Sequence, residues 1–163
     1  MKKLVLNVDF ESEYTLLGIC THLKDYRLSW FLNQNLFLTL TKIEDLKIAS
    51  PKSKDVSAFS FYHCNDEENF SMFSFISNKT PGNTLLPEFH QADFLLLING
   101  QIGKLNEKKY ISEIKKITNV LTVFNIEINK TKNLESVISD VELHLTDISK
   151  KEKLGYNRKT EIN

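Results

Sequence analysis

The sequence feature that most constrains the fold is a nearly continuous apolar run, Ala92 to Ile98, set between polar segments. A run this short and this apolar predicts a central β-strand that is covered on both faces. A helix capped by Asn106 and a second strand, Val120 to Ile128, are predicted to follow. Strand, helix and strand at these lengths predict a β-α-β crossover between two parallel strands.

Two more segments, Val56 to Cys64 and Phe70 to Ser77, place Phe and Ser at alternating positions. The five residues between them, 65–69, are all polar and have the length of a hairpin loop. The pattern predicts a β-hairpin in a half-exposed sheet. Its Phe residues suit a core, or a sheet face that pairs two subunits.

The N-terminal part predicts a strand at Lys3 to Phe10 and then a long helix from Glu13 to about Asn35. The helix is predicted from an apolar stripe (Leu16, Cys20, Leu23, Trp30 and Phe31). Gly18 within it costs about 1 kcal/mol of helix propensity. Asn133 can cap a final helix.

These elements predict an α+β fold: a mostly antiparallel sheet with one β-α-β crossover, on which the long N-terminal helix and the C-terminal helix pack. We expect a single domain at residues 1–149 and a flexible charged tail at 150–163.

The charged residues balance, 21 basic against 21 acidic, so the chain has no overall field that attracts a polyanion. Only Arg27 and Arg158 are arginines, which argues against specific nucleic-acid recognition. No stretch approaches the roughly 20 apolar residues of a membrane helix, and the start of the chain does not fit a secretory signal. Cys20 and Cys64 are therefore expected as buried thiols, and the expected location is the cytoplasm.

The segment Leu86-Pro87-Glu88-Phe89-His90-Gln91-Ala92-Asp93-Phe94 resembles the signature of the IPExxxVDY family, small bacterial proteins named by that motif. Three further segments (18–30, 76–79 and 119–122) are similar to parts of the family, so the likeness covers about Lys3 to Ile128. Pro87, Glu88 and Asp93 match the motif, whereas Leu86, Ala92 and Phe94 replace its Ile, Val and Tyr. The resemblance implies no reaction, ligand or catalytic residue.

A second resemblance is one of pattern. The strand, helix and strand of Ala92 to Ile128 are similar to half of a ferredoxin-like regulatory domain of the ACT or Lrp-effector type. Such a domain implies small ligands bound at strand and helix edges, and pairing of two copies through their sheets.

The motif segment has two interpretations. Glu88 and Asp93 could bind a cation or an amine, or act with His90 as acid and base. In the structural interpretation, which we favour, Pro87 fixes its own φ, Glu88 pairs with a lysine or caps a helix, and Asp93 accepts backbone N–H bonds.

The segment from His22 to Trp30 is the predicted partner surface. A groove built from Tyr26, Arg27 and Trp30, with Lys24, Asp25 and His22 beside it, could hold an anion or a partner's side chain. The alternative places Trp30 and Leu23 in the core and leaves the charged residues in solvent.

Other site chemistries are not supported. Cys20 with His22, and His63 with Cys64, are spaced so that neither pair can chelate one ion, and no metal or cofactor is predicted. Gly100-Gln101-Ile102-Gly103 precedes a helix but lacks the Lys-Ser/Thr of a phosphate-binding P-loop.

The leading hypothesis is a non-enzymatic interaction or regulatory module, acting as a homodimer or an adaptor for a protein partner. An ACT-like sensor that uses the loops Leu86–Asp93 and Gly100–Gly103 to bind a small molecule is the first alternative. A small enzyme built on Glu88, His90 and Asp93 is the second.

Overall fold

The structure is a computed structural model that describes residues 13–49 and 54–161. Beyond residue 155 it describes only the backbone. The predicted strand Lys3 to Phe10 lies outside these residues. The chain divides after Thr131 into two compact units. The first contains the sheet and two helices, and the second is a helix.

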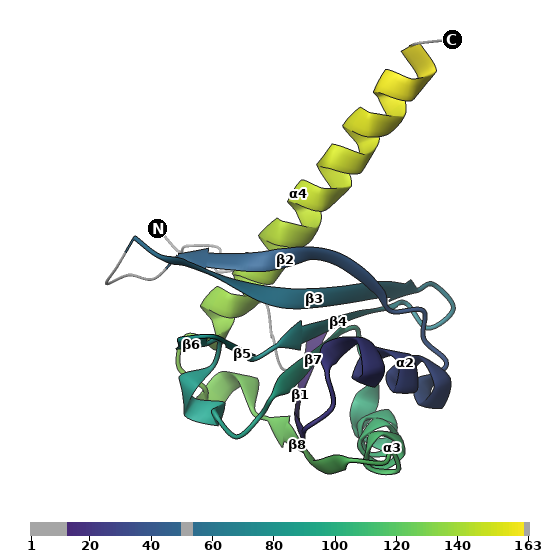
Figure 1. Cartoon of the computed structure of the whole chain (residues 1–163). Helices are drawn as coiled ribbons and strands as arrows, with labels where there is room; N and C mark the ends of the chain where they lie inside the picture. The colour runs from purple at the N-terminus through teal and green to yellow at the C-terminus, as the bar shows by residue number, and fades with distance from the viewer. Residues whose placement is uncertain (1–12, 50–53, 162–163) are drawn as a thin grey trace, which may run out of the picture. The chain divides into compact units, whose positions relative to one another are not determined.

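The first unit is built on a six-stranded sheet in which every neighbouring pair is antiparallel. In spatial order the strands are β2 (Thr41–Ala49), β3 (Val56–Asp66), β4 (Ser71–Ser77), β7 (Phe94–Asn99), β1 (Tyr14–Thr21) and β8 (Val120–Ile126). Figure 1 shows β2 at the upper edge of this sheet and β8 at the lower edge. A two-stranded hairpin, β5 (Lys79–Thr80) with β6 (Asn83–Thr84), stands apart from it. The structure confirms the predicted α+β class with a mostly antiparallel sheet.

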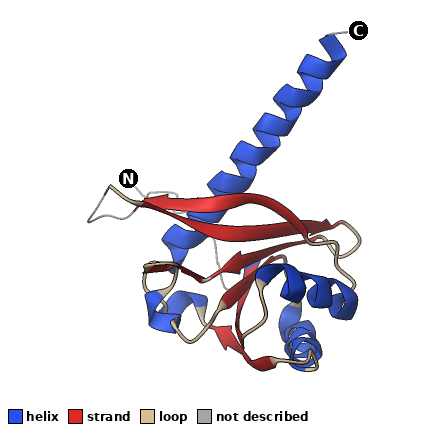
Figure 2. Ribbon diagram, in the orientation of Figure 1, coloured by secondary structure: helices blue, strands red, loops and turns tan. Residues whose placement is uncertain are grey.

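Two helices, α2 (Asp25–Leu36) and α3 (Gly103–Lys115), lie on the same side of the sheet (Figures 1 and 2). The main core fills the space between them and the strands. Its members are apolar side chains from the helices and from the alternate positions of the strands that face them (Leu17, Ile19, Leu28, Leu32, Phe73, Phe75, Leu96, Ile98 and Ile114). The strand period of two therefore sends one set of residues toward the helices.

The predicted hairpin is confirmed, since β3 and β4 pair from Phe61↔Ile76 to Asp66↔Ser71. Four of its five Phe residues are core residues. Phe59, Phe61, Phe73 and Phe75 are at most 1% exposed, whereas Phe70, on the loop between the two strands, is 89% exposed. The expectation of a half-exposed sheet was wrong for β4, where Ser71 and Ser74 are buried as well, whereas β3 carries partly exposed residues between its buried ones.

The predicted crossover is present, with one correction. α3 connects β7 to β8, but these strands are not neighbours, because β1 lies between them and pairs with both. Each pairing is antiparallel, so β7 and β8 run in the same direction without forming a parallel ladder. A strand from a distant part of the sequence occupies the position that the local pattern assigned to β8.

The prediction of a long N-terminal helix was wrong over residues 14–21, which form β1, an interior strand between β7 and the edge strand β8. A continuous apolar run satisfies helical and strand spacing alike, and here the strand prevails because both faces of β1 are buried. Gly18 fits the strand for a steric reason. A Cβ atom built at Gly18 would lie 2.6 Å from the Cζ atom of Phe124 on β8. The helix begins only at Asp25.

The remaining helices begin close to their predicted starts. α3 starts at Gly103 rather than after Asn106, whose side-chain amide instead donates to the carbonyl of Ile102 at 2.8 Å. The second unit is α4 (Leu134–Glu161), which follows Asn133 directly and runs through most of the segment predicted as a tail. Among the described residues, none of the helices combines the length and the hydropathy required to cross a membrane.

Candidate functional site

The motif segment is held by Asn78, a fully buried residue just after β4. Its side-chain amide donates to the carbonyls of Phe89 and Ala92 at 2.9 and 2.8 Å, and its side-chain carbonyl accepts from the backbone N–H of Leu86 at 2.9 Å. The Asn78 backbone carbonyl accepts from Leu85 at 2.7 Å. One amide therefore replaces the regular backbone pairing that this loop lacks.

Asp93 joins the same loop to β1. One carboxylate oxygen accepts from the backbone N–H of Thr21 at 2.9 Å, and the other lies 3.1 Å from Nζ of Lys79. The backbone N–H of Asp93 donates to the carbonyl of Ile19 at 2.9 Å, and its carbonyl accepts from Asn78 at 3.0 Å. Asp93 thus fixes the ends of β1 and β4 against the start of β7, as the structural interpretation expects.

The other motif residues do not gather around Asp93. Pro87 and Glu88 lie in a short 3-10 helix, η1 (Pro87–Phe89), and both are exposed. His90 is exposed as well, and neither it nor Glu88 makes a hydrogen bond or ion pair with another residue that the structure describes. A constellation of Glu88, His90 and Asp93 around one reacting group is therefore not formed.

Apolar contacts complete this loop. The ring of Phe89 lies 6.0 Å from that of Phe124, centroid to centroid, beside the position where Gly18 leaves space. The Cys20 thiol donates to the carbonyl of Gln91 at 2.8 Å. Burial, and then the charge of Asp93, raise the pKa of this thiol, so it is held as a neutral hydrogen-bond donor.

The predicted partner surface lies on and just before α2, whose inner side is firmly anchored. Leu28, Leu32 and Leu36 are buried in the main core. At the first residue of the helix, the hydroxyl of Tyr62 donates to the carboxylate of Asp25 at 3.3 Å. Burial, and then Asp25, raise the pKa of Tyr62 to about 12, so this hydroxyl keeps its proton at neutral pH.

The outer side of α2 exposes large aromatic side chains. Tyr26 is 59% exposed and Trp30 is 57% exposed, one helical turn further on. The alternative interpretation is therefore wrong for Trp30, although Leu23 does pack against the core and Lys24 and Arg27 are exposed. The ring of Phe31 is in edge contact with Trp30 at 5.1 Å between centroids. The Arg27 guanidinium lies 6.0 Å from the centroid of the Phe31 ring. We call Tyr26, Arg27, Trp30 and Phe31 the α2 surface.

The remaining residues of the predicted surface surround this group. His22 and Lys24 are exposed, whereas Asp25 is half-buried by its contact with Tyr62. Phe37, which ends the helix in a left-handed conformation with φ 55°, is 92% exposed. The sequence analysis missed Phe37, and the signal that could have found it is an aromatic residue next to a helix end with no apolar partner at helical spacing.

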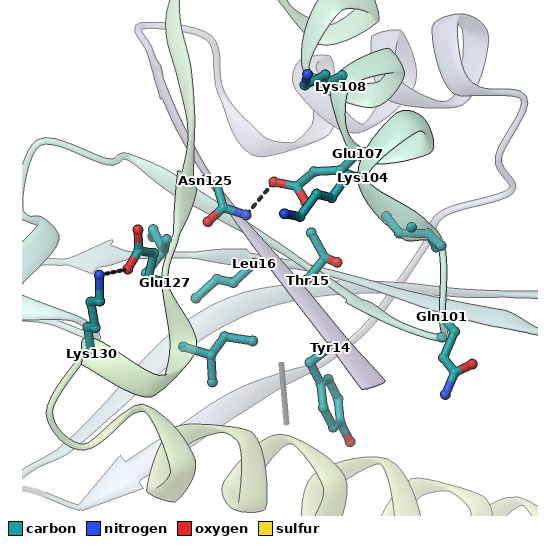
Figure 3. A pocket seen from close by; sticks show the side chains of 15 residues that line it. Tyr14, Thr15, Leu16, Gln101, Lys104, Glu107, Lys108, Asn125, Glu127 and Lys130 are labelled. Carbon is teal, nitrogen blue, oxygen red and sulfur yellow. Dashed lines mark hydrogen bonds and ion pairs between the residues drawn. The ribbon is translucent and has the colours of Figure 1, made fainter. Parts of the chain in front are cut away.

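A cavity of about 810 Å³ opens where β7 leads into α3 (Figure 3). Its lining comes from residues 14–16, 100–104, 107–108 and 125–128, with Lys130. It includes the Gly100–Gly103 loop that the sequence singled out. None of Pro87, Glu88 and Asp93 lines it.

The polar groups of this cavity are partly paired. The Asn125 amide donates to Glu107 at 2.5 Å, and Lys130 pairs with Glu127 at 2.8 Å. Figure 3 shows Lys104 pointing toward the middle of the cavity, where it pairs with none of the described residues. An anion could therefore meet the uncommitted ammonium group of Lys104 and the backbone at the start of α3.

Metal binding finds no support in the part of the chain that the structure describes, where no group of three or more His, Cys, Asp or Glu side chains could hold an ion. The two spacings considered from the sequence are also separated in space. Cys20 is buried while His22 is exposed. His63 contacts the hydroxyl of Ser74 at 3.2 Å, and Cys64 is buried in the main core.

The comparisons with known proteins add no relative: no protein-family model, curated protein or solved structure matches the chain. The resemblance to the IPExxxVDY family stays a prediction. The function must therefore be argued from the site alone.

Proposed function

We propose that this protein is a non-enzymatic interaction module that binds a partner protein through the α2 surface. The observation that carries the proposal is the exposure of Tyr26 and Trp30, more than half of each side chain, on a helix whose other side is buried in the core. Exposing two large aromatic groups side by side serves no purpose in the fold of the chain itself. Such groups are typical of surfaces that another protein covers.

The residue types on this surface support the same conclusion. Trp, Tyr and Arg are the residues that most often dominate the binding energy of protein interfaces. Tyr26, Arg27 and Trp30 occur here within five positions. The sequence contains one Trp and two Arg, so Trp30 and half of the arginines lie in this short segment.

The surface is also ordered before a partner arrives. Phe31 contacts both Trp30 and Arg27, and the inner side of α2 is fixed by the core. Side chains already held in place lose less conformational freedom when they bind, which leaves more of the interaction energy for affinity. The partner that fits has an apolar pocket for Trp30 and acidic groups at its rim, facing Arg27 and Lys24.

The experiment is an affinity capture with the wild-type protein, followed by a binding titration with the purified partner. Tyr26→Ala with Trp30→Ala should weaken the affinity about 30-fold or more, because interface positions of this kind contribute 2 kcal/mol or more. The matched control is Phe70→Asn, which removes an aromatic group that is 89% exposed on the β3–β4 loop. Equal binding by wild-type and the double variant would refute the proposal.

A homodimer is the simplest form of such a module, and light scattering at micromolar concentration tests it. If the partner is a second copy, the wild-type protein scatters as a dimer and the double variant as a monomer. A wild-type monomer that also captures no partner would count against the module itself.

A second candidate function is favoured by the cavity. The order of β4, β7, β1 and β8, with α2 after β1 and α3 after β7, supports a ferredoxin-like arrangement extended by the β2–β3 hairpin. In this proposal the protein senses a small anionic ligand at the Gly100–Gly103 loop, where Lys104 is uncommitted.

Thermal unfolding with a panel of small carboxylates and phosphates tests the sensor. A ligand at 100 times its dissociation constant should add about 2.7 kcal/mol to the free energy of unfolding. Lys104→Ala should abolish that gain, whereas Lys109→Ala, on the same helix but outside the cavity lining, should keep it. A panel without any stabilising member would remove this candidate.

A further inference from the structure

The two edges of the sheet are built differently. β2, at one edge, carries four charged residues among its nine (Lys42, Glu44, Asp45 and Lys47). Its pairing with β3 shifts register between Ile43 and Leu46, which introduces a bulge. Charges and bulges at an edge are the means by which proteins prevent another strand from adding to a sheet.

β8, at the other edge, lacks this protection over most of its length. Its sequence, Val-Leu-Thr-Val-Phe-Asn-Ile, contains no charged residue and no proline. Its register with β1 shifts once, between Thr122 and Val120, so that Leu121 is the extra residue and is 65% exposed. From Thr122 to Ile126 the pairing with β1 is regular. Within the described residues β8 pairs only with β1, so five residues present one free backbone edge.

α3 borders this edge with positive charge. It packs against β8 and carries four lysines against two glutamates. The Glu107 carboxylate accepts a hydrogen bond from Asn125 of β8. The next residue, Lys108, lines the cavity (Figure 3). Lys104, Lys108 and Lys115 are four and seven positions apart, a spacing that puts them on one side of the helix.

We propose that the β8 edge and this row of lysines bind an acidic segment of a partner protein in extended conformation, which adds to the sheet as a further strand along Thr122 to Ile126. The backbone of the segment would supply the hydrogen bonds, and its carboxylates would face the α3 lysines. This surface is separate from the α2 surface and does not depend on it.

Charge decides against the other occupants of this edge. Two copies related by a two-fold axis at β8 would bring the lysine rows of both α3 helices toward each other, and like charges oppose that contact. Single-stranded nucleic acid would suit the lysines. However, the one aromatic side chain of β8, Phe124, already lies against Phe89, and neither β8 nor α3 contains an arginine.

The test uses the full chain and a fluorescein-labelled eight-residue peptide of alternating Glu and Thr, followed by fluorescence anisotropy. We expect binding that weakens as salt is added. Lys108→Glu with Lys115→Glu should weaken it at least about tenfold, since two charges facing the peptide are reversed. The matched control is Lys42→Glu with Lys47→Glu, which makes the same charge change at the β2 edge and should alter the affinity less than twofold.

Two further peptides separate strand addition from simple charge attraction. A peptide of alternating Glu and Pro keeps the charges but loses half of the backbone donors, so it should bind at least about tenfold more weakly. A peptide of alternating Lys and Thr should not bind. In hydrogen exchange, those amides of residues 122–126 that point away from β1 should become protected when the Glu-Thr peptide is added and should exchange freely without it, whereas the amides that donate to β1 should be protected in both cases.

Four outcomes would each overturn the proposal. They are equal binding of the Glu-Pro peptide, an equal loss in the β2-edge control, protection without peptide of the amides at 122–126 that point away from β1, and tighter binding of an oligothymidine of the same length. Far-UV circular dichroism verifies that the variants are folded. The double variant Tyr26→Ala with Trp30→Ala should bind the peptide like wild type. Lys115→Glu alone should weaken peptide binding but leave the affinity of a cavity ligand unchanged, because Lys115 does not line the cavity. Failure here is thus distinct from failure of either proposed function.

Discussion

The motif segment (Leu86–Asp93) and the outer side of α2 differ in whether their polar and aromatic side chains find partners within the fold. Around Asn78 and Asp93, polar groups from three strands and a loop meet, and each of these two side chains is paired with the backbone. On α2, Trp30 and Tyr26 keep more than half of their surface in solvent. Both segments stand out in the sequence because they combine polar and aromatic residues. The fold uses the first to hold itself together and leaves the second available to a partner.

Substitutions in these two regions should therefore change the free energy of unfolding by different amounts. Asn78→Ala should have the largest effect, because it leaves the N–H of Leu86 and the carbonyl of Ala92 without partners and removes one of the two hydrogen bonds to the carbonyl of Phe89. Each unsatisfied group costs about 1–3 kcal/mol, so we expect a loss of about 3–5 kcal/mol in the free energy of unfolding, measured by urea titration. A loss below about 1 kcal/mol would mean that the loop does not depend on Asn78.

A smaller effect is expected at Asp93, whose side chain is one-third exposed. Asp93→Ala should cost about 1–2 kcal/mol, because a charged acceptor is removed from the Thr21 N–H, while the partly solvated pair with Lys79 adds little. Asp93→Asn is the matched control, since it keeps an acceptor for Thr21 and should lose clearly less. Equal losses in the two variants would show that the charge, and not the backbone hydrogen bond, is what matters.

His63 extends the comparison to pH. Burial lowers the pKa of His63 below its ordinary 6.5, so the unfolded chain takes up a proton more readily than the folded protein. This contribution to stability is complete above about pH 6.5 and is lost as the pH falls through the folded-state pKa. Between about pH 7.5 and pH 5 the wild-type protein should therefore lose more stability than His63→Gln. An identical pH dependence in the two proteins would contradict the burial of this ring.

The smallest effect on stability is expected on the α2 surface. Trp30→Ala should change the free energy of unfolding by no more than about 0.5 kcal/mol, as substitutions at exposed positions usually do, although the same change should weaken partner binding. Chemical denaturation and the binding titration, made on the same preparation, separate the two effects. A loss of stability comparable to that of Asn78→Ala would show that Trp30 stabilises the fold, and would contradict the distinction between the motif segment and the α2 surface.

The sequence predicted the elements that have a single interpretation. The Phe-Ser alternation predicted the β3–β4 hairpin, and the apolar run at Ala92–Ile98 predicted β7, because few other structures bury such patterns. It failed at residues 14–21, where the apolar residues from Leu16 to Cys20 fit the spacing of a helix and of a strand alike. The steric signal that decides, the space that Gly18 leaves for Phe124, involves a residue more than 100 positions away.

The candidate site shows the same division. The segment His22 to Trp30 was predicted as a partner surface from residue types alone, and the exposure of Trp30 had to be learned from the structure. Asn78 was not predicted as a structural centre at all, because an asparagine after a strand is ordinary in any sequence. Its importance arises only when Leu86, Phe89 and Ala92 are brought around it.

By itself, the sequence determined the local patterns: which segments could be strands, which could be helices, and where aromatic and basic residues gather. The tertiary structure alone decided that β1 separates β7 from β8, that Asn78 and Asp93 are bound to the backbone, and that β8 ends the sheet without charges of its own. The physical reason is that periodicity reports how a segment meets its surroundings, whereas strand order and hydrogen-bond partners depend on contacts between residues far apart in the chain.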